Sequence, residues 1–142
     1  MRMRGCRAVW PALVALLLLC VAGCGRYYPV HGTVTYADGT PVTEGLVVFE
    51  RQEGGTAITA RGEIQPDGSY RLSTAKPGDG VPPGKYRVLV APKTDLNDVD
   101  KPRPAPFDPS YTEFNTSGLE FEVKPDATEF PIRVTKPGKR RQ

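Results

Sequence analysis

The residue types that catalyse reactions or bind metals are few in this chain of 142 residues. His31 is the single histidine, which excludes a histidine-based triad or a multi-histidine metal site within one chain. We expect His31 on the outer face of a first strand, as an ordinary surface residue. Glu120 and Glu122 fall on one face of another expected strand and point to water, unlike a glycosidase pair. The sequence therefore predicts no catalytic residue, no cofactor and no enzymatic activity.

A short acidic segment has the oxygen ligands that a calcium loop uses, in Asp95, Asn97, Asp98 and Asp100. The sixth position of such a loop is glycine and the twelfth is glutamate. Here those positions hold Asp100 and Pro106. We therefore expect a solvated loop and no metal site.

Cys24 follows an apolar run that has the features of a signal peptide. The run is preceded by three arginines and no acidic residue, and it ends in small residues. That order is typical of a secretory leader that is removed from the mature protein. The segment Val21-Ala22-Gly23-Cys24 resembles the lipobox of bacterial lipoproteins. The resemblance implies that residues 1–23 are cleaved and that Cys24 becomes the first residue and carries the lipid, typically three acyl chains such as palmitate.

Two other interpretations of the leader stay open. A transmembrane helix needs roughly 20 apolar residues, whereas the run from residue 8 to 21 has about 14 and contains Pro11. The leader of a soluble exported protein needs no cysteine after its small residues. Val21 also stands where lipoboxes prefer leucine.

The composition of the segment after the leader excludes further classes. The formal charge of +3 equals the contribution of Arg2, Arg4 and Arg7, so the mature chain is neutral. A neutral chain lacks the electrostatic footprint of nucleic-acid binding. Because two of the three cysteines leave with the leader and Cys24 would carry lipid, no disulfide within one chain is expected. The length is sufficient for one domain.

Short alternating apolar runs predict an all-β domain over residues 30–135. Alternation with period two indicates strands with one buried face, and the 15 glycines and 15 prolines supply turns between them. The expected strands are 30–36, 46–50, 58–64, 70–72, 86–90, 119–123 and 130–134. Two antiparallel sheets packed face to face would bury the apolar faces of these seven strands.

Three details refine this prediction. The third and fourth strands are joined by Pro66-Asp67-Gly68 and are predicted to form a hairpin. Gly62 within a strand indicates a bulge or a close approach of another backbone. Pro131 cannot donate to a β-ladder, so the last strand is expected at a sheet edge.

Five short motifs follow one another in a recognisable order. They are Val30-x-Gly32-x-Val34, Asp38-Gly39-x-Pro41-Val42 with Gly45-x-Val47-x-Phe49, Ala60-x-Gly62-x-Ile64, Asp67-Gly68-x-Tyr70-x-Leu72 and Pro83-Gly84-x-Tyr86-x-Val88. This order resembles that of carboxypeptidase regulatory-like domains. Tyr111 with residues 116–119 is similar to the late segment of small bacterial lipoproteins of this group. The resemblance implies a single seven-stranded antiparallel β-sandwich, transthyretin-like or immunoglobulin-like, that is not itself a catalyst.

The segment 92–117 has no strand pattern and contains five prolines. Loops of this length tend to be functional or disordered. Phe107, Tyr111 and Phe114 lie in it. They either fasten the loop to the sandwich or form an exposed aromatic platform that binds a sugar or a peptide.

Together these features predict four regions. They are a signal peptide with lipobox (1–23), the lipidated Cys24 with a short tether (24–29), the β-sandwich (30–135) and a disordered basic tail (136–142). Because seven alternating strands finish at the end opposite to their start, the tail should point away from the membrane.

The expected role is that of an exported, lipid-anchored protein of the cell envelope. In the lipoprotein resemblance, the absence of Asp at position 25 favours the outer membrane or the cell surface. The protein would act structurally or in protein interaction, with an envelope protein or polysaccharide as partner and without nucleic acid. The alternative is a carbohydrate- or peptide-binding module that uses loop 92–117.

Overall fold

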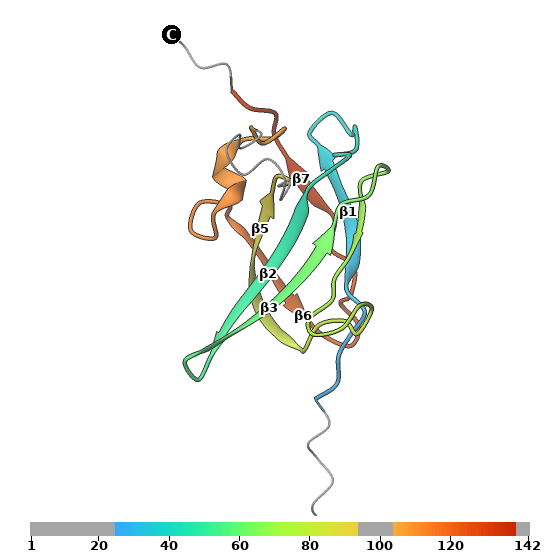
Figure 1. The fold of residues 1–142 in the computed structure, drawn as a ribbon, viewed down its shortest axis with the longest axis vertical. Helices are drawn as coiled ribbons and strands as arrows, with labels where there is room; N and C mark the ends of the chain where they lie inside the picture. Colours follow the sequence, from blue (N-terminus) through green and yellow to red (C-terminus); the bar gives the residue numbers. More distant parts are fainter. Residues whose placement is uncertain (1–24, 94–103, 139–142) are drawn as a thin grey trace, which may run out of the picture.

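The computed structural model describes residues 25–93 and 104–138, which fold into two β-sheets (Figure 1). Cys24, the signal peptide, the acidic segment and the last four residues lie outside the described residues. The strands are β1 (His31–Tyr36), β2 (Leu46–Glu53), β3 (Thr56–Glu63), β4 (Ser69–Arg71), β5 (Gly84–Ala91), β6 (Leu119–Val123) and β7 (Ile132–Val134). A short 3-10 helix, η1 (Pro109–Thr112), precedes β6. All seven predicted strands are present.

The strands form a three-stranded sheet in the order β4-β1-β7 and a four-stranded sheet in the order β3-β2-β5-β6. All neighbours in the four-stranded sheet are antiparallel, as are β1 and β4. The prediction of a wholly antiparallel fold is wrong for one pair, because β1 and β7 are parallel. Strands that alternate in direction leave the first and the seventh pointing the same way, so they are parallel when they become neighbours. The edge position predicted for the last strand is confirmed.

The predicted hairpin of β3 and β4 is wrong, because these strands belong to different sheets. β3 instead forms a hairpin with β2 through Gly54 and Gly55, whose φ angles are 56° and 82°. Such positive φ angles suit the tight turns that join twisted antiparallel strands. A single bridge between Arg61 and Ser73, with two backbone hydrogen bonds of 2.9 Å, still connects β3 to the chain after β4.

One hydrophobic core lies between the two sheets. Its members come from every strand, and the largest of those with almost no exposure are Phe49, Leu72, Tyr86, Phe107 and Ile132. Alternate residues along β1, β2 and β5 are buried, as the period-two pattern predicts. Burying a large apolar side chain contributes about 1.5–3 kcal/mol, so this core is the main favourable term for folding.

Two glycines allow backbones to approach closely at this core. A Cβ atom on Gly62 would lie 2.5 Å from the carbonyl oxygen of Arg71, and one on Gly32 would lie 2.1 Å from that of Phe130. The close approach predicted at Gly62 is confirmed. A larger residue at either position would force the strands apart.

The two ends of the described chain leave the domain at opposite ends (Figure 1). Near the start, Tyr28 and Val81 exchange two backbone hydrogen bonds of 2.8 Å. At the other end, Lys136 Nζ donates to Asp38 Oδ2 at 2.8 Å. The chain therefore leaves the domain at Lys136 on the side away from Tyr28.

Candidate functional site

Phe107, one of the three aromatic residues of the predicted platform, is buried. Its exposed fraction is 0%, and it belongs to the core between the sheets. The backbone beside it is fixed by a hydrogen bond of 2.9 Å from Asp108 N–H to the carbonyl oxygen of Thr135. An exposed platform of all three aromatics is therefore not formed, and Phe107 fastens its loop to the core.

Tyr111 and Phe114 are partly buried on the same segment. Tyr111 packs against the core. The Phe114 ring lies 5.4 Å from the guanidinium of Arg87 on β5, an arrangement that allows a cation–π interaction. Ser117 Oγ donates to the carbonyl oxygen of Val88 at 2.6 Å. Residues 104–117 are thus fixed to β5 at several points.

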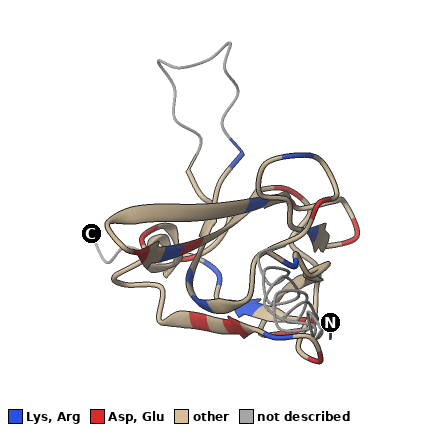
Figure 2. Cartoon of the chain, turned by 90° about the horizontal axis from the view of Figure 1, so that it is seen from below, with Lys and Arg blue, Asp and Glu red and all other residues tan. Residues whose placement is uncertain are grey.

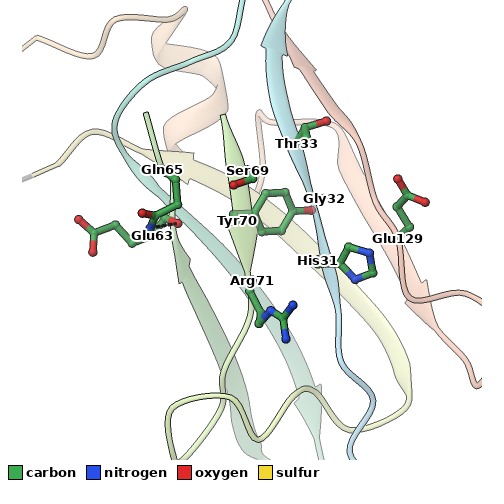
Figure 3. Close-up of a pocket in the computed structure, with 9 residues that line it drawn as sticks. All are labelled: His31, Gly32, Thr33, Glu63, Gln65, Ser69, Tyr70, Arg71 and Glu129. Atoms are coloured by element: carbon green, nitrogen blue, oxygen red, sulfur yellow. Dashed lines mark hydrogen bonds between the residues drawn. The ribbon is translucent and has the colours of Figure 1, made fainter. Parts of the chain in front are cut away.

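A groove that was not predicted lies on the outer face of the three-stranded sheet (Figure 3). Its volume is about 590 Å³, within the usual range for ligand sites. We call it the β1–β4 groove, and it is lined by His31, Gly32, Thr33, Glu63, Gln65, Ser69, Tyr70, Arg71 and Glu129. Strands β1, β3 and β4, the loop after β3 and the segment before β7 contribute to it.

The strand register explains why this face is hollow. Thr33 on β1 is paired with Ser69 on β4, so two short hydroxyl side chains lie side by side on the outer face. Longer side chains surround them on the neighbouring positions, among them Arg71 and Gln65. Ser69 Oγ donates to Asp67 Oδ1 at 2.6 Å, which lowers the pKa of Asp67 and fixes the turn before β4. The bottom of the groove is therefore formed by short polar side chains, and its edges are formed by longer ones.

A row of three titratable side chains crosses the groove. His31 is paired with Arg71 of β4 on one side and bridges to Glu129, just before β7, on the other. Since neighbouring strands are about 4.8 Å apart, Arg71 and Glu129 are separated by about 10 Å at the backbone. Within the described part of the chain, neither Arg71 nor Glu129 forms an ion pair. The row therefore has a positive and a negative end, with an imidazole between them.

The two remaining titratable groups at the groove, Glu63 and Tyr70, already form hydrogen bonds. Glu63 Oε1 accepts from Lys93 Nζ at 2.7 Å. Tyr70 Oη donates to the carbonyl oxygen of Phe130 at 2.6 Å, across Gly32. Burial raises the pKa of Tyr70, so its hydroxyl stays protonated and structural. Tyr70 is therefore no nucleophile or base for a bound molecule.

Sequence reasoning missed Arg71 and Glu129 as members of a site. Alternation had placed His31 on an outer face, and the structure confirms that it is exposed. What joins the three residues is the order β4-β1-β7, which brings together positions 31, 71 and 129. No local signal in the sequence indicates that order.

Other kinds of site find no support in residues 25–93 and 104–138. No group of three or more His, Cys, Asp or Glu side chains in these ranges is arranged to hold a metal ion. No helix in the same ranges is long and apolar enough to cross a membrane. Basic and acidic residues are interspersed along the described chain (Figure 2). The acidic segment 95–100 lies outside these ranges.

No family model, curated protein or solved structure matches the chain.

Proposed function

We propose that the chain is a lipoprotein anchored through Cys24, with a β domain that has a structural or protein-interaction role in the cell envelope. The domain performs no catalysis. The leader and the residues Val21-Ala22-Gly23-Cys24 support export and acylation, through their resemblance to a lipobox. The absence of Asp at position 25 favours the outer membrane or the cell surface.

The observation that carries this proposal is how soon the fold begins after Cys24. Tyr28 is already bonded to Val81 through both of its backbone groups. Four residues of extended chain reach at most about 14 Å, so the domain would lie directly against the membrane surface. Tyr27, 45% exposed, lies on this short link, and among the described residues it is the one large hydrophobic side chain that is this exposed. A link of this length suits an anchor at Cys24.

We further propose that the two sheets form a transthyretin-like sandwich of the carboxypeptidase regulatory-like kind. The glycines of the motifs that carry this resemblance have structural duties here. Gly32 and Gly62 permit close approach of neighbouring backbone, and Gly68 has a φ of 84° in the turn before β4. A common core between sheets of three and four strands agrees with the proposal.

The alternative role for loop 92–117, a platform that binds a sugar or peptide, is not favoured by the buried Phe107. Non-catalytic function is supported by the groups at the β1–β4 groove. His31 is the only histidine of the chain, and the Tyr70 hydroxyl is engaged with Phe130.

The test of anchoring is mass spectrometry of the full chain expressed in a bacterial host that acylates lipoproteins. We expect a mature N-terminus at Cys24 with the mass of attached acyl chains, and recovery in the membrane fraction. Cys24→Ser should abolish acylation, and its product should be either released from the membrane or left with an uncleaved leader. Cys20→Ser, a matched control in the leader, should change neither the acylation nor the cleavage. An unmodified thiol at Cys24, or a wild-type product that starts at Met1, would refute the proposal.

A further inference from the structure

We propose that the β1–β4 groove binds an extended peptide segment of a partner protein. The segment places an acidic side chain beside Arg71 and a basic side chain beside Glu129. This inference rests on the interaction role proposed above, and it names the surface and the chemistry of the partner.

The charges of the groove support a ligand with two opposite charges. Arg71 and Glu129 carry opposite charges, are about 10 Å apart at the backbone, and have no ion pair with any described residue. A ligand that presents a carboxylate at one end and an ammonium or guanidinium group at the other would satisfy both. Charge-assisted hydrogen bonds of this kind are stronger than neutral ones, and an arginine can bind a carboxylate with two parallel bonds.

The floor of the groove supports a ligand with its own polar backbone. The Thr33 and Ser69 hydroxyls and the His31 imidazole line the groove, with His31 between the two charges and the hydroxyls beside that row. Donors and acceptors of an extended peptide backbone can bond to such groups. In an extended chain every second side chain faces the same way, and successive residues rise about 3.3 Å. The two charged side chains that face the groove should therefore be two or four positions apart.

A peptide fits this groove better than a saccharide does. Sugars are commonly held by exposed aromatic faces, which provide apolar contact to the ring. The one aromatic residue lining the groove is Tyr70, which is only 3% exposed and directs its ring into the core. The groove therefore lacks a stacking surface but has the two charges that a peptide can match.

The position of the groove indicates which partner segments can reach it. His31 follows Tyr28 by three residues, so this edge of the groove lies near the end of the domain where the chain continues to Cys24 (Figure 1). With the domain anchored at that cysteine, the groove lies a short way above the lipid surface. A segment close to the membrane in a neighbouring protein is the partner that fits.

The test uses the full chain in detergent micelles and fluorescent eight-residue peptides as probes. Each probe has a Gly/Ser background with one Glu and one Lys, two or four positions apart, in either order. Further probes have two Glu, two Lys or two Gln at those positions. Fluorescence anisotropy should show that one Glu/Lys order binds at least about tenfold more tightly than the Gln probe, with affinity falling as salt is added.

Charge-reversing variants give the decisive readout. Arg71→Glu puts an acidic group at each end of the row and should transfer preference to the two-Lys probe. Glu129→Lys puts a basic group at each end of the row and should transfer preference to the two-Glu probe. The double variant should restore binding of a Glu/Lys probe in the opposite order. Lys85→Glu, a charge reversal at an exposed residue of β5 that does not line the groove, is the control and should leave every affinity unchanged.

Three outcomes would overturn the proposal. They are equal affinity for charged and neutral probes, no binding of any probe at millimolar concentration, and preferences unaffected by Arg71→Glu in a variant that melts normally. A fourth outcome would also overturn it, namely that a charged oligosaccharide binds in an Arg71-dependent way while no peptide binds. Since the measurement needs no acyl chain, Cys24→Ser protein should give the same affinities. Failure of anchoring is thereby separated from failure of the groove.

Discussion

Arg71 and Arg87 are the same residue type on the outer faces of the two sheets, yet their surroundings differ. Arg87 on β5 donates to Glu50 Oε1 at 2.9 Å and to Asn115 Oδ1 at 3.2 Å, and it lies over the Phe114 ring. Arg71 on β4 has no ion pair with a described residue and lines the β1–β4 groove. The Arg87 guanidinium of the four-stranded sheet bonds within the molecule, whereas the Arg71 guanidinium of the three-stranded sheet forms no ion pair with a described residue.

The difference arises from the segment that connects β5 to β6. Residues 104–117 of this segment return along β5 and supply Phe114 and Asn115 to Arg87. No comparably long segment of the described chain covers the outer face of the three-stranded sheet. The connection that enters β4 from β3 is short, and that face stays open at the β1–β4 groove. The comparison therefore predicts that substitutions around residues 104–117 affect stability, while those in the groove affect binding.

The largest effect is expected for Phe107→Ala, which removes the core anchor of residues 104–117. Because Phe107 is fully buried, the truncation should lower the free energy of unfolding by about 3–5 kcal/mol. Urea unfolding followed by circular dichroism measures it. Phe114→Ala, at a partly buried ring of the same segment, should cost about 1 kcal/mol or less. Equal losses for the two variants would refute the anchoring role of Phe107.

The outcome at Phe107 also shows where sequence reasoning is sufficient and where it is not. Alternation around Val34 and Val88 predicts strands because every second side chain must be buried, and the structure confirms both strands. Phe107 stands in a Pro-rich segment without periodicity. Its burial depends on where the loop meets the core, which no neighbouring residue reveals.

Strand pairing was predicted less well for a similar reason. Asp67-Gly68 is a good local turn signal, but it joins two sheets rather than two paired strands. Gly54-Gly55 is the turn of the actual hairpin. Alternation determines on which face of its strand a residue such as Thr33 lies. Which residue becomes its neighbour on the next strand, here Ser69, depends on the packing of the whole chain. The β1–β4 groove is built from such neighbours and was therefore missed.

A smaller loss is expected for Gly32→Ala, which tests the crowding beneath the groove. The added methyl group would lie 2.1 Å from the carbonyl oxygen of Phe130 and 2.9 Å from the Tyr70 hydroxyl. Forcing β1 away from these atoms should cost about 1–3 kcal/mol of unfolding free energy. Gly25→Ala, where a Cβ atom has no neighbour within 4 Å, is the control. An unchanged urea midpoint for Gly32→Ala would contradict the close approach.

The comparison of the two arginines is tested directly by Arg87→Ala and Arg71→Ala. Loss of the partly exposed contacts of Arg87 should reduce unfolding free energy by about 0.5–1 kcal/mol, since such pairs contribute little. Arg71→Ala should leave it unchanged within about 0.5 kcal/mol, as is usual for surface substitutions that remove no specific interaction. Thermal and urea unfolding of both variants provide the measurement. A larger loss for Arg71→Ala would mean that its charge serves the fold and is not reserved for a partner.

The smallest effect is expected from the ion pair that ends the three-stranded sheet, and it should appear as a pH dependence. The hydrogen bond from Lys136 lowers the pKa of Asp38, and the same bond raises the pKa of Lys136. The contribution of Asp38 is present above its ordinary value of 3.8 and is lost as pH falls through its lower folded value. That of Lys136 is present below 10.5 and is lost as pH rises through its higher folded value. The difference in urea midpoint between the wild type and Asp38→Asn should therefore be greatest at intermediate pH and vanish at both extremes.

Glu129→Gln removes an acidic charge from the same sheet without breaking a described ion pair, so it should leave the midpoint unchanged. A difference for Asp38→Asn that is independent of pH would show that Asp38 acts through its turn and not through its charge.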